Sequence, residues 1–271
     1  MNPETKADPI DIIALRNDAR APISATADVR HYDDYFRIDR TDDPVAWWSG
    51  AQRVARLVID DLPAAELDED LQADLLGGVS RLLLAGGAVR AGGGAAVPAG
   101  PAEPPGDGTA ARRWKLGHHL FHHMLSLMNS HTDGLGDALG DSDWIAVRLL
   151  LGELTALYDA ATATMHYAAG FPATAYEAAV RPTMEPPWMP PGFSGVFNRE
   201  HEVLLDRLAT LKPRLRGRAA ERGMPAETAR TARALWKAQS RNRREHKLIC
   251  EKFVPGGSSL LQQHFTEKKG R

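Results

Sequence analysis

Long stretches with apolar residues at helical spacing constrain the fold of this chain most strongly. Runs that alternate apolar and polar residues, as half-buried strands require, do not stand out in the sequence. Long amphipathic helices joined by short links bury their apolar faces best against one another. We therefore predict an all-α helical bundle. Its expected helices span 44–61, 65–84, 110–131, 142–168, 196–222 and 225–253, with a short one after Gly257.

Two segments fall outside this pattern. Residues 1–43 are polar, and we expect a small irregular N-terminal segment that ends where Asp43-Pro44 opens the first helix. Residues 85–109 are mostly Ala, Gly and Pro, which cannot fill a core and cost much entropy to order. They are predicted to form a flexible surface loop. Because 271 residues suffice for one large core, we expect residues 1–271 to form a single domain.

Charge and cysteine content narrow the class of protein. The formal net charge of −2 predicts neither a nucleic-acid partner nor an acidic lipid surface. The apolar stretches fall short of the roughly 18–20 residues that span a bilayer, so we expect no membrane partner. The charged N-terminus lacks an apolar signal core, which predicts a cytoplasmic protein. The single cysteine, Cys250, excludes an intrachain disulfide.

Four histidines lie within six residues of the predicted helix 110–131. His118 and His122, and likewise His119 and His123, are one helical turn apart. This spacing also occurs in helix-borne zinc sites, but no Glu-x-x-His motif or second cysteine supplies further ligands. The alternative is a polar seam between helices. We expect at least one of the four to face a cavity.

A second candidate site lies on the last long helix. His246 and Cys250 are separated by one turn, so their Cα atoms lie about 6 Å apart on one face. If iron lies above the His246 imidazole, Cys250 lies under the porphyrin periphery, where a thiol can meet a vinyl group. The two heme propionates need cations, which this helix carries at Arg241, Arg243, Arg244 and Lys247. The alternative is a solvated basic helix with an incidental histidine and a buried cysteine.

A third segment joins irregular backbone to a helix start. Pro and Gly keep residues 186–195 irregular, and the helix that follows carries Arg199 and His201 near its beginning. A helix N-terminus with an arginine in its first turn suits a carboxylate. The alternative is a surface arginine that pairs with Glu200 or Glu202.

Together, these segments resemble the histidine-ligated heme superfamily of tryptophan 2,3-dioxygenase and indoleamine dioxygenase. The stretch NRREHKLICEKFVPGGSSLL matches the late helix and Gly-Gly-Ser-Ser-like loop of those enzymes. By this resemblance His246 is the iron ligand, Arg243 binds a propionate, and Ser258 of the loop lies near the substrate. The stretch GFSGVFNR keeps the Gly, Phe and Arg of a substrate-binding motif, which implies that Phe193 and Arg199 contact the substrate.

Two departures make a sister branch the better match. Pro255 replaces the dioxygenases' Thr before Gly-Gly, and the stretch GHHLFHH is richer in histidine than their distal helix. The chain is more similar to heme-dependent tyrosine hydroxylases of bacterial antibiotic pathways. A methyltyrosine-hydroxylating member carries a His…His-x-x-x-Cys motif, with one thioether from the cysteine to the heme edge. His246 and Cys250 fit that motif, and His201 or a histidine of 118–123 would be the earlier one.

This resemblance implies an aromatic amino-acid oxidation. The leading expectation is hydroxylation of L-tyrosine beside its phenol OH, which gives L-DOPA, with hydrogen peroxide or dioxygen as the oxidant. A distal acid–base group is needed, and His118 or His119 is expected to supply it because the unperturbed pKa of histidine is about 6.5. Arg199 would hold the substrate carboxylate.

Several alternatives remain open from the sequence. The chain could be an indole-ring dioxygenase that acts on tryptophan or a derivative, or a non-enzymatic heme sensor or carrier. The least favoured alternative is a heme-free bundle with a histidine-bound divalent metal. Oligomers are frequent in the larger superfamily, so a homo-oligomer is a further expectation.

Overall fold

The computed structural model describes residues 13–16, 27–86, 109–191, 193, 198–216 and 223–254, and it confirms the all-α prediction. Several helix ends lie close to their predicted positions, and α10 begins within one residue of its predicted start. The helix predicted after Gly257 and most of the predicted loop 85–109 lie outside the described residues. The long helices are α2 (Pro44–Asp61), α3 (Glu69–Ala85), α5 (Thr109–Asp141), α6 (Trp144–Ala168), α8 (Arg199–Leu215) and α10 (Ala226–Phe253).

Side-chain caps fix where several of these helices begin. Asp43 accepts a hydrogen bond from the backbone N–H of Val45, and Pro44 occupies the first turn of α2, as predicted. Asp68 and Asp143 cap α3 and α6 in the same way. The helix predicted from residue 65 therefore starts only at Glu69, because the cap sets the first hydrogen-bonded turn.

α5 continues well past its predicted end at residue 131. The helix runs on through Gly134 and Gly136 to Asp141. Leu135 and Leu139 lie on one face of this extension and are buried. Their burial outweighs the weak helix propensity of the intervening glycines.

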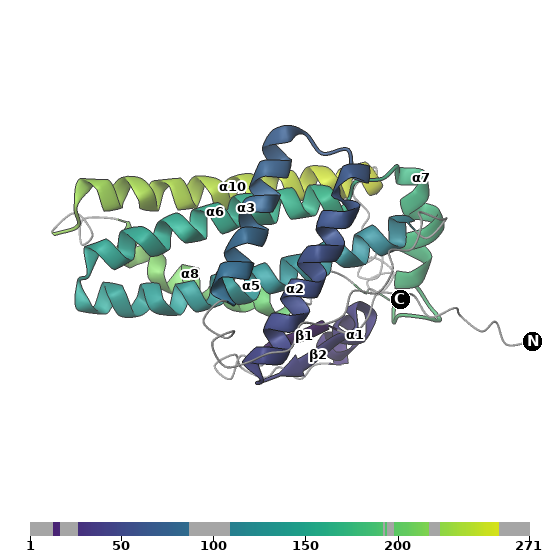
Figure 1. Cartoon of the computed structure of the whole chain (residues 1–271), viewed down its shortest axis with the longest axis horizontal. Coiled ribbons are helices and arrows are strands. Elements are labelled where there is room, and N and C mark those ends of the chain that lie inside the picture. Colours follow the sequence, from purple (N-terminus) through teal and green to yellow (C-terminus); the bar gives the residue numbers. More distant parts are fainter. Residues whose placement is uncertain are drawn as a thin grey trace, which may run out of the picture.

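The long helices form two directions of packing. Figure 1 shows α5, α6 and α10 running lengthwise, with α2 and α3 crossing them. α6 is central, because it packs against α5, α10 and α3, and α8 packs against α5. Buried side chains recur along α6 at helical spacing, at Val147, Leu151, Leu154, Tyr158 and Ala161. Among the described residues, none of the helices is both long and apolar enough to pass through a membrane.

The irregular structure predicted for the N-terminal segment is wrong where the structure describes it. Residues 27–36 form helix α1 (Ala27–Phe36), and strand β1 (Ile13–Arg16) pairs in parallel with β2 (Ile38–Thr41). Tyr32, Tyr35 and Phe36 of α1 are buried in the core. Tertiary burial of these rings stabilises a helix whose other residues are mostly charged or small. The strands have four residues each, too few to show an alternating pattern.

Residues 173–184, which lie between two of the predicted helices, form short helical turns. These are α7 (Ala173–Ala175), the π-helical turn η2 (Tyr176–Val180) and the 3-10 turn η3 (Arg181–Met184). Tyr176 and Val180 are buried and fasten the turns to the bundle.

Candidate active site

His118 lies on α5 with one ring nitrogen already engaged. Its Nδ1 is 2.7 Å from the carbonyl oxygen of Trp114, so Nδ1–H is the donor and Nε2 keeps its lone pair. The ring stacks between Trp114 and Phe36, at centroid distances of 4.2 and 4.6 Å. Burial lowers the pKa of His118 to about 3, with smaller contributions from His122 and His246. The ring is therefore neutral at pH 7.

His119 has different surroundings. Its side chain is buried, and its Nε2 lies 2.6 Å from the carbonyl oxygen of Phe36, at the end of α1. Burial lowers the pKa of His119 to about 3. His123, one turn later, is also buried and meets the Trp47 ring edge-on at 5.5 Å. Of the two residues predicted for acid–base work, His119 is buried and donates to the Phe36 carbonyl, which fastens α1 to α5, whereas the His118 ring is only partly buried.

The predicted iron ligand, His246, lies on α10. Its side chain is exposed, yet the protein around it lowers its pKa by burial. Burial also lowers the pKa of His201, at the start of α8, and the charges of His246 and Arg243 lower it further. The charge of His246 lowers the pKa of His118 as well. Histidines of α5 and α8 therefore both lie within electrostatic range of His246, although the three helices are far apart in sequence.

Cys250 follows one turn after His246. The thiol is free and its side chain is exposed, unlike the buried cysteine of the alternative interpretation. Burial of its surroundings and the charge of Glu251 raise the pKa of the thiol. The sulfur is therefore protonated at neutral pH, which disfavours its use as a thiolate ligand.

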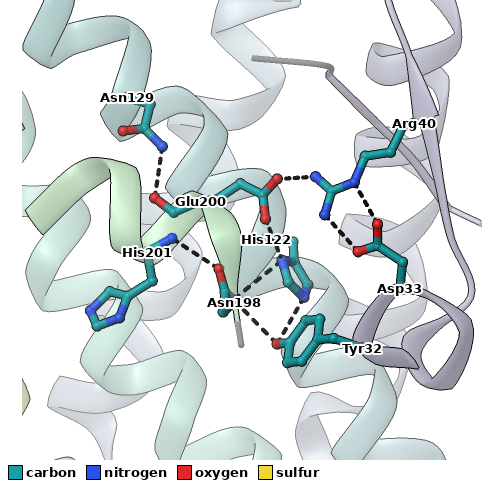
Figure 2. A network of polar contacts seen from close by, with 8 residues as sticks. All are labelled: Tyr32, Asp33, Arg40, His122, Asn129, Asn198, Glu200 and His201. Carbon is teal, nitrogen blue, oxygen red and sulfur yellow. Dashed lines mark hydrogen bonds and ion pairs between the residues drawn. The ribbon is translucent and has the colours of Figure 1, made fainter. Parts of the chain in front are cut away.

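Polar contacts with α1, β2 and α5 hold the start of α8 (Figure 2). Asn198 caps the helix, and its Oδ1 accepts a hydrogen bond of 2.9 Å from the backbone N–H of His201. Glu200 is buried and pairs with Arg40 of β2 and His122 of α5, so it is not the surface partner of Arg199 that the alternative interpretation required. Four residues of this region were not predicted from the sequence to belong to the site: Tyr32, Arg40, Asn198 and Glu200.

The predicted substrate contacts are only partly described. Arg199 is the first residue of α8 and is half-buried. Phe193 is buried beside α1, with ring centroids 4.9 Å from Tyr35 and 6.2 Å from Tyr32. Ser258 lies outside the described residues, so its predicted role stays a prediction.

The donor set on α10 suits a heme iron. A neutral imidazole is the usual protein ligand of heme, and lowering the pKa of His246 keeps its ring neutral. Arg243, three residues earlier on the same helix, supplies a cation of the kind that a propionate needs. By contrast, the described residues contain no group of three or more His, Cys, Asp or Glu side chains able to hold a bare metal ion. The side chains present therefore fit heme, and the described part of the chain offers no ligand set for the divalent-metal alternative.

Comparisons with known proteins point to one family. The family model described as SfmD 3-methyl-L-tyrosine peroxygenase matches residues 3–234. A 3-methyl-L-tyrosine peroxygenase from Streptomyces lavendulae is 36% identical over 116 residues, which are 42% of this chain and 32% of that protein. The aligned part thus spans about a third of the relative's length. A crystal structure of reduced SfmD, soaked with sodium hydrosulfite, matches with a TM-score of 0.58 and 26% identity, covering 84% of this chain and 76% of that one.

The family match covers most of the chain but ends before the predicted iron ligand. Residue 234 lies near the start of α10, so Arg243, His246 and Cys250 fall beyond the matched range. Their assignment depends on the motif and on the geometry described above. Because the family model matches well over half of the chain, this protein belongs to the SfmD 3-methyl-L-tyrosine peroxygenase family.

Proposed function

We propose that this protein is a heme-dependent peroxygenase that hydroxylates the aromatic ring of a tyrosine-type amino acid in secondary metabolism. The observation that carries the proposal is that His118 and His201 both lie within electrostatic range of His246. Family membership favours 3-methyl-L-tyrosine as the substrate. L-tyrosine, which would give L-DOPA, is the second substrate to test.

Residues of α10 would hold the cofactor. His246 would ligate the iron through its neutral ring, and Arg243 would pair with a propionate. Cys250 is placed to hold the heme edge through a thioether, since its protonated sulfur lies one turn away on the same helix. When bound, the heme supplies a ferric centre at which peroxide oxygen becomes reactive.

His118 is the residue best placed to move a proton. Its Nε2 lone pair can accept a proton from hydrogen peroxide and return it as the O–O bond breaks. With a pKa of about 3 the ring is neutral at neutral pH, so its Nε2 is free of a proton and can accept one. The bond from Nδ1 to the Trp114 carbonyl fixes the tautomer that this role needs.

The start of α8 would hold the amino acid. Arg199 lies in the first turn, where its guanidinium and the helix N-terminus both favour a carboxylate. Anchoring the carboxylate fixes how far the phenol ring reaches, which decides the ring carbon that is hydroxylated. Phe193, beside the tyrosines of α1, would contribute an apolar edge.

The decisive experiment mixes purified ferric protein with hydrogen peroxide and either L-tyrosine or 3-methyl-L-tyrosine. We expect a catechol product. Liquid chromatography separates a catechol from the ring-opened product that an indole dioxygenase would form from tryptophan. His246→Ala should lose both heme and product. His166→Ala provides the matched control, since His166 is a half-exposed histidine of α6 that pairs with Glu245 of α10; it should keep both.

Each alternative predicts a different result. Heme and catechol formation that survive in His246→Ala would refute the assignment of the ligand. A wild-type heme spectrum that no aromatic amino acid shifts would favour a sensor or carrier. The thioether is tested by acidified acetone, which should leave heme on the wild type and remove it from Cys250→Ser; complete extraction from the wild type would exclude the covalent link.

A further inference from the structure

We infer that five side chains form a positioning unit that fixes the first turn of α8, and with it Arg199 and His201. We call this unit the α8 anchor; it consists of Tyr32, Arg40, His122, Asn198 and Glu200. The inference deepens the proposed function and rests on it for the role of Arg199. None of the five is proposed to touch the substrate or the cofactor.

The anchor joins four elements at one point (Figure 2). Asn198 Nδ2 lies 3.2 Å from the Tyr32 hydroxyl oxygen, which in turn lies 3.2 Å from His122 Nε2. His122 Nδ1 lies 3.5 Å from Glu200 Oε2, and Arg40 pairs with the other oxygen of that carboxylate. The sequence separations reach 166 residues, so these contacts tie α1, β2 and α5 to the start of α8.

The helix cap orients this set of contacts. Asn198 Oδ1 caps the helix, so Nδ2 faces Tyr32 and donates to its oxygen. The Tyr32 hydrogen then points to His122 Nε2. His122 Nδ1 lies 3.4 Å from Asn198 Nδ2 and 3.5 Å from Glu200 Oε2, so the chain of contacts ends on a carboxylate.

The carboxylate at the end of this chain is ionised. Burial alone would raise the pKa of Glu200, but His122 and Arg40 hold it at about 2. A buried charge with incomplete partners would be costly, whereas this one receives two. Burial correspondingly raises the pKa of Tyr32, so the phenol stays protonated and keeps its role as a donor.

The bonds converge on one turn of backbone. Asn198 and Glu200 lie in that turn, and the carbonyl oxygen of Glu200 also accepts a hydrogen bond of 2.9 Å from Asn129 of α5. Figure 2 shows the His201 ring directed away from the unit. The α8 anchor thus holds one side of the turn, and the His201 ring lies on the other side. A buried polar network of this kind sets a single geometry more effectively than apolar packing, which tolerates sliding.

Two buried tyrosines give a matched test. Tyr32 and Tyr167 are both fully buried, and each donates one phenol hydrogen bond into a buried ionic network, Tyr167 to Asp61 at 2.8 Å. Both Tyr32→Phe and Tyr167→Phe should lower the melting temperature, Tyr32→Phe by more, since it loses the bond to His122 and the bond from Asn198, whereas Tyr167→Phe loses one bond. Only Tyr32→Phe should loosen α8.

Two measurements distinguish the variants. Hydrogen–deuterium exchange of the amides of residues 199–204 should become roughly tenfold faster in Tyr32→Phe and stay unchanged in Tyr167→Phe, as expected for the loss of about one hydrogen bond from the turn. The dissociation constant of 3-methyl-L-tyrosine, read from the heme absorption band, should rise roughly tenfold in Tyr32→Phe alone, with an unchanged heme content. Asn198→Ser repeats the test if Tyr32→Phe does not fold, since serine keeps the cap but removes the donor to Tyr32.

The outcomes separate this inference from the proposed function. Equal exchange rates and equal dissociation constants in the two Tyr→Phe variants would overturn the anchor. If the wild type binds no heme or no amino acid, the proposed function fails, and the exchange rates alone then decide whether the anchor exists. Faster exchange with an unchanged dissociation constant would show that the unit holds α8 without positioning Arg199, which also overturns the inference.

Discussion

Replacing Gly117 by alanine should destabilise the protein, although alanine is the better helix former. Gly117 lies on α5 where that helix meets the end of α6. A Cβ atom there would lie 2.4 Å from the Cβ of Ala168 and 2.8 Å from its Cα. Carbon atoms in contact prefer about 3.5–4.0 Å, so the two helices would have to move apart by about 1 Å. Because the nearest atoms belong to a backbone and a Cβ, no flexible side chain can yield instead.

Two opposing terms set the size of the effect. Overpacking a dense helix interface costs about 1–3 kcal/mol, whereas Gly→Ala in a helix interior returns about 1 kcal/mol. We therefore expect the free energy of unfolding to fall by about 1 kcal/mol, which lowers the melting temperature by about 2–4 °C in a domain of this size. Since Gly117 precedes His118, the same displacement should weaken heme binding.

The measurement is thermal unfolding followed by circular dichroism, with Gly152→Ala as the control. Gly152 lies inside α6, and a Cβ there would meet nothing within 4 Å. This variant should therefore gain about 0.5–1 kcal/mol from the reduced entropy of the unfolded chain. If Gly117→Ala proved as stable as Gly152→Ala, the close approach of α5 and α6 would be refuted.

Four further variants test other contacts. Arg113→Met should lower the free energy of unfolding by about 3 kcal/mol, because Asp61 loses its buried guanidinium partner at 2.8 Å; a loss below about 1 kcal/mol in urea unfolding would contradict this. Glu200→Gln should weaken the fall in the free energy of unfolding between pH 4.5 and pH 2. The folded pKa of Glu200, about 2, lies below its ordinary value of 4.5, so its contribution is present above pH 4.5 and is lost as the pH falls toward 2; an unchanged slope over that window would argue against the ion pairs. His118→Ala should abolish hydroxylation with little change in melting temperature, whereas His119→Ala should mainly lower the melting temperature, since it strips a buried carbonyl of its donor; a reversal of the two effects would exchange the assigned roles.

The sequence predicted the long helices well where a cap coincided with the start of an apolar face. Asp43-Pro44 fixed the beginning of α2, and the apolar face of α10 could be recognised from residue 226 onward. The wrong predictions for the end of α5 and for α1 have one cause, which is burial that local helix propensity does not reflect. Leu135 and Leu139 extend α5 through its glycines. Tyr32, Tyr35 and Phe36 stabilise α1, and their spacing of three and four residues was a helical signal that the surrounding charges obscured.

In the candidate site too, local spacing could be predicted from the sequence and long-range contacts could not. His246 and Cys250 could be paired from sequence, because one helical turn fixes their separation whatever the rest of the fold does. Contacts between distant segments could not be predicted in this way. Arg40 and Glu200 are 160 residues apart, and each is surrounded by other charges in the sequence, so neither stands out as part of a buried pair. Glu200 was therefore misread as a surface neighbour of Arg199.

The choice between His118 and His119 shows why a helical pattern cannot separate a catalytic histidine from a structural one. Adjacent helix residues point about 100° apart, so the two rings must face different neighbours, but periodicity does not say which neighbours those are. The packing of α1 decides the matter, because the Phe36 carbonyl binds one ring while the Phe36 side chain only stacks on the other. His119, which binds the carbonyl of α1, is fully buried, whereas His118 is only partly buried, and through Tyr32 the same short helix also reaches the start of α8. The segment that the sequence left irregular is therefore the one that orients both sides of the proposed site.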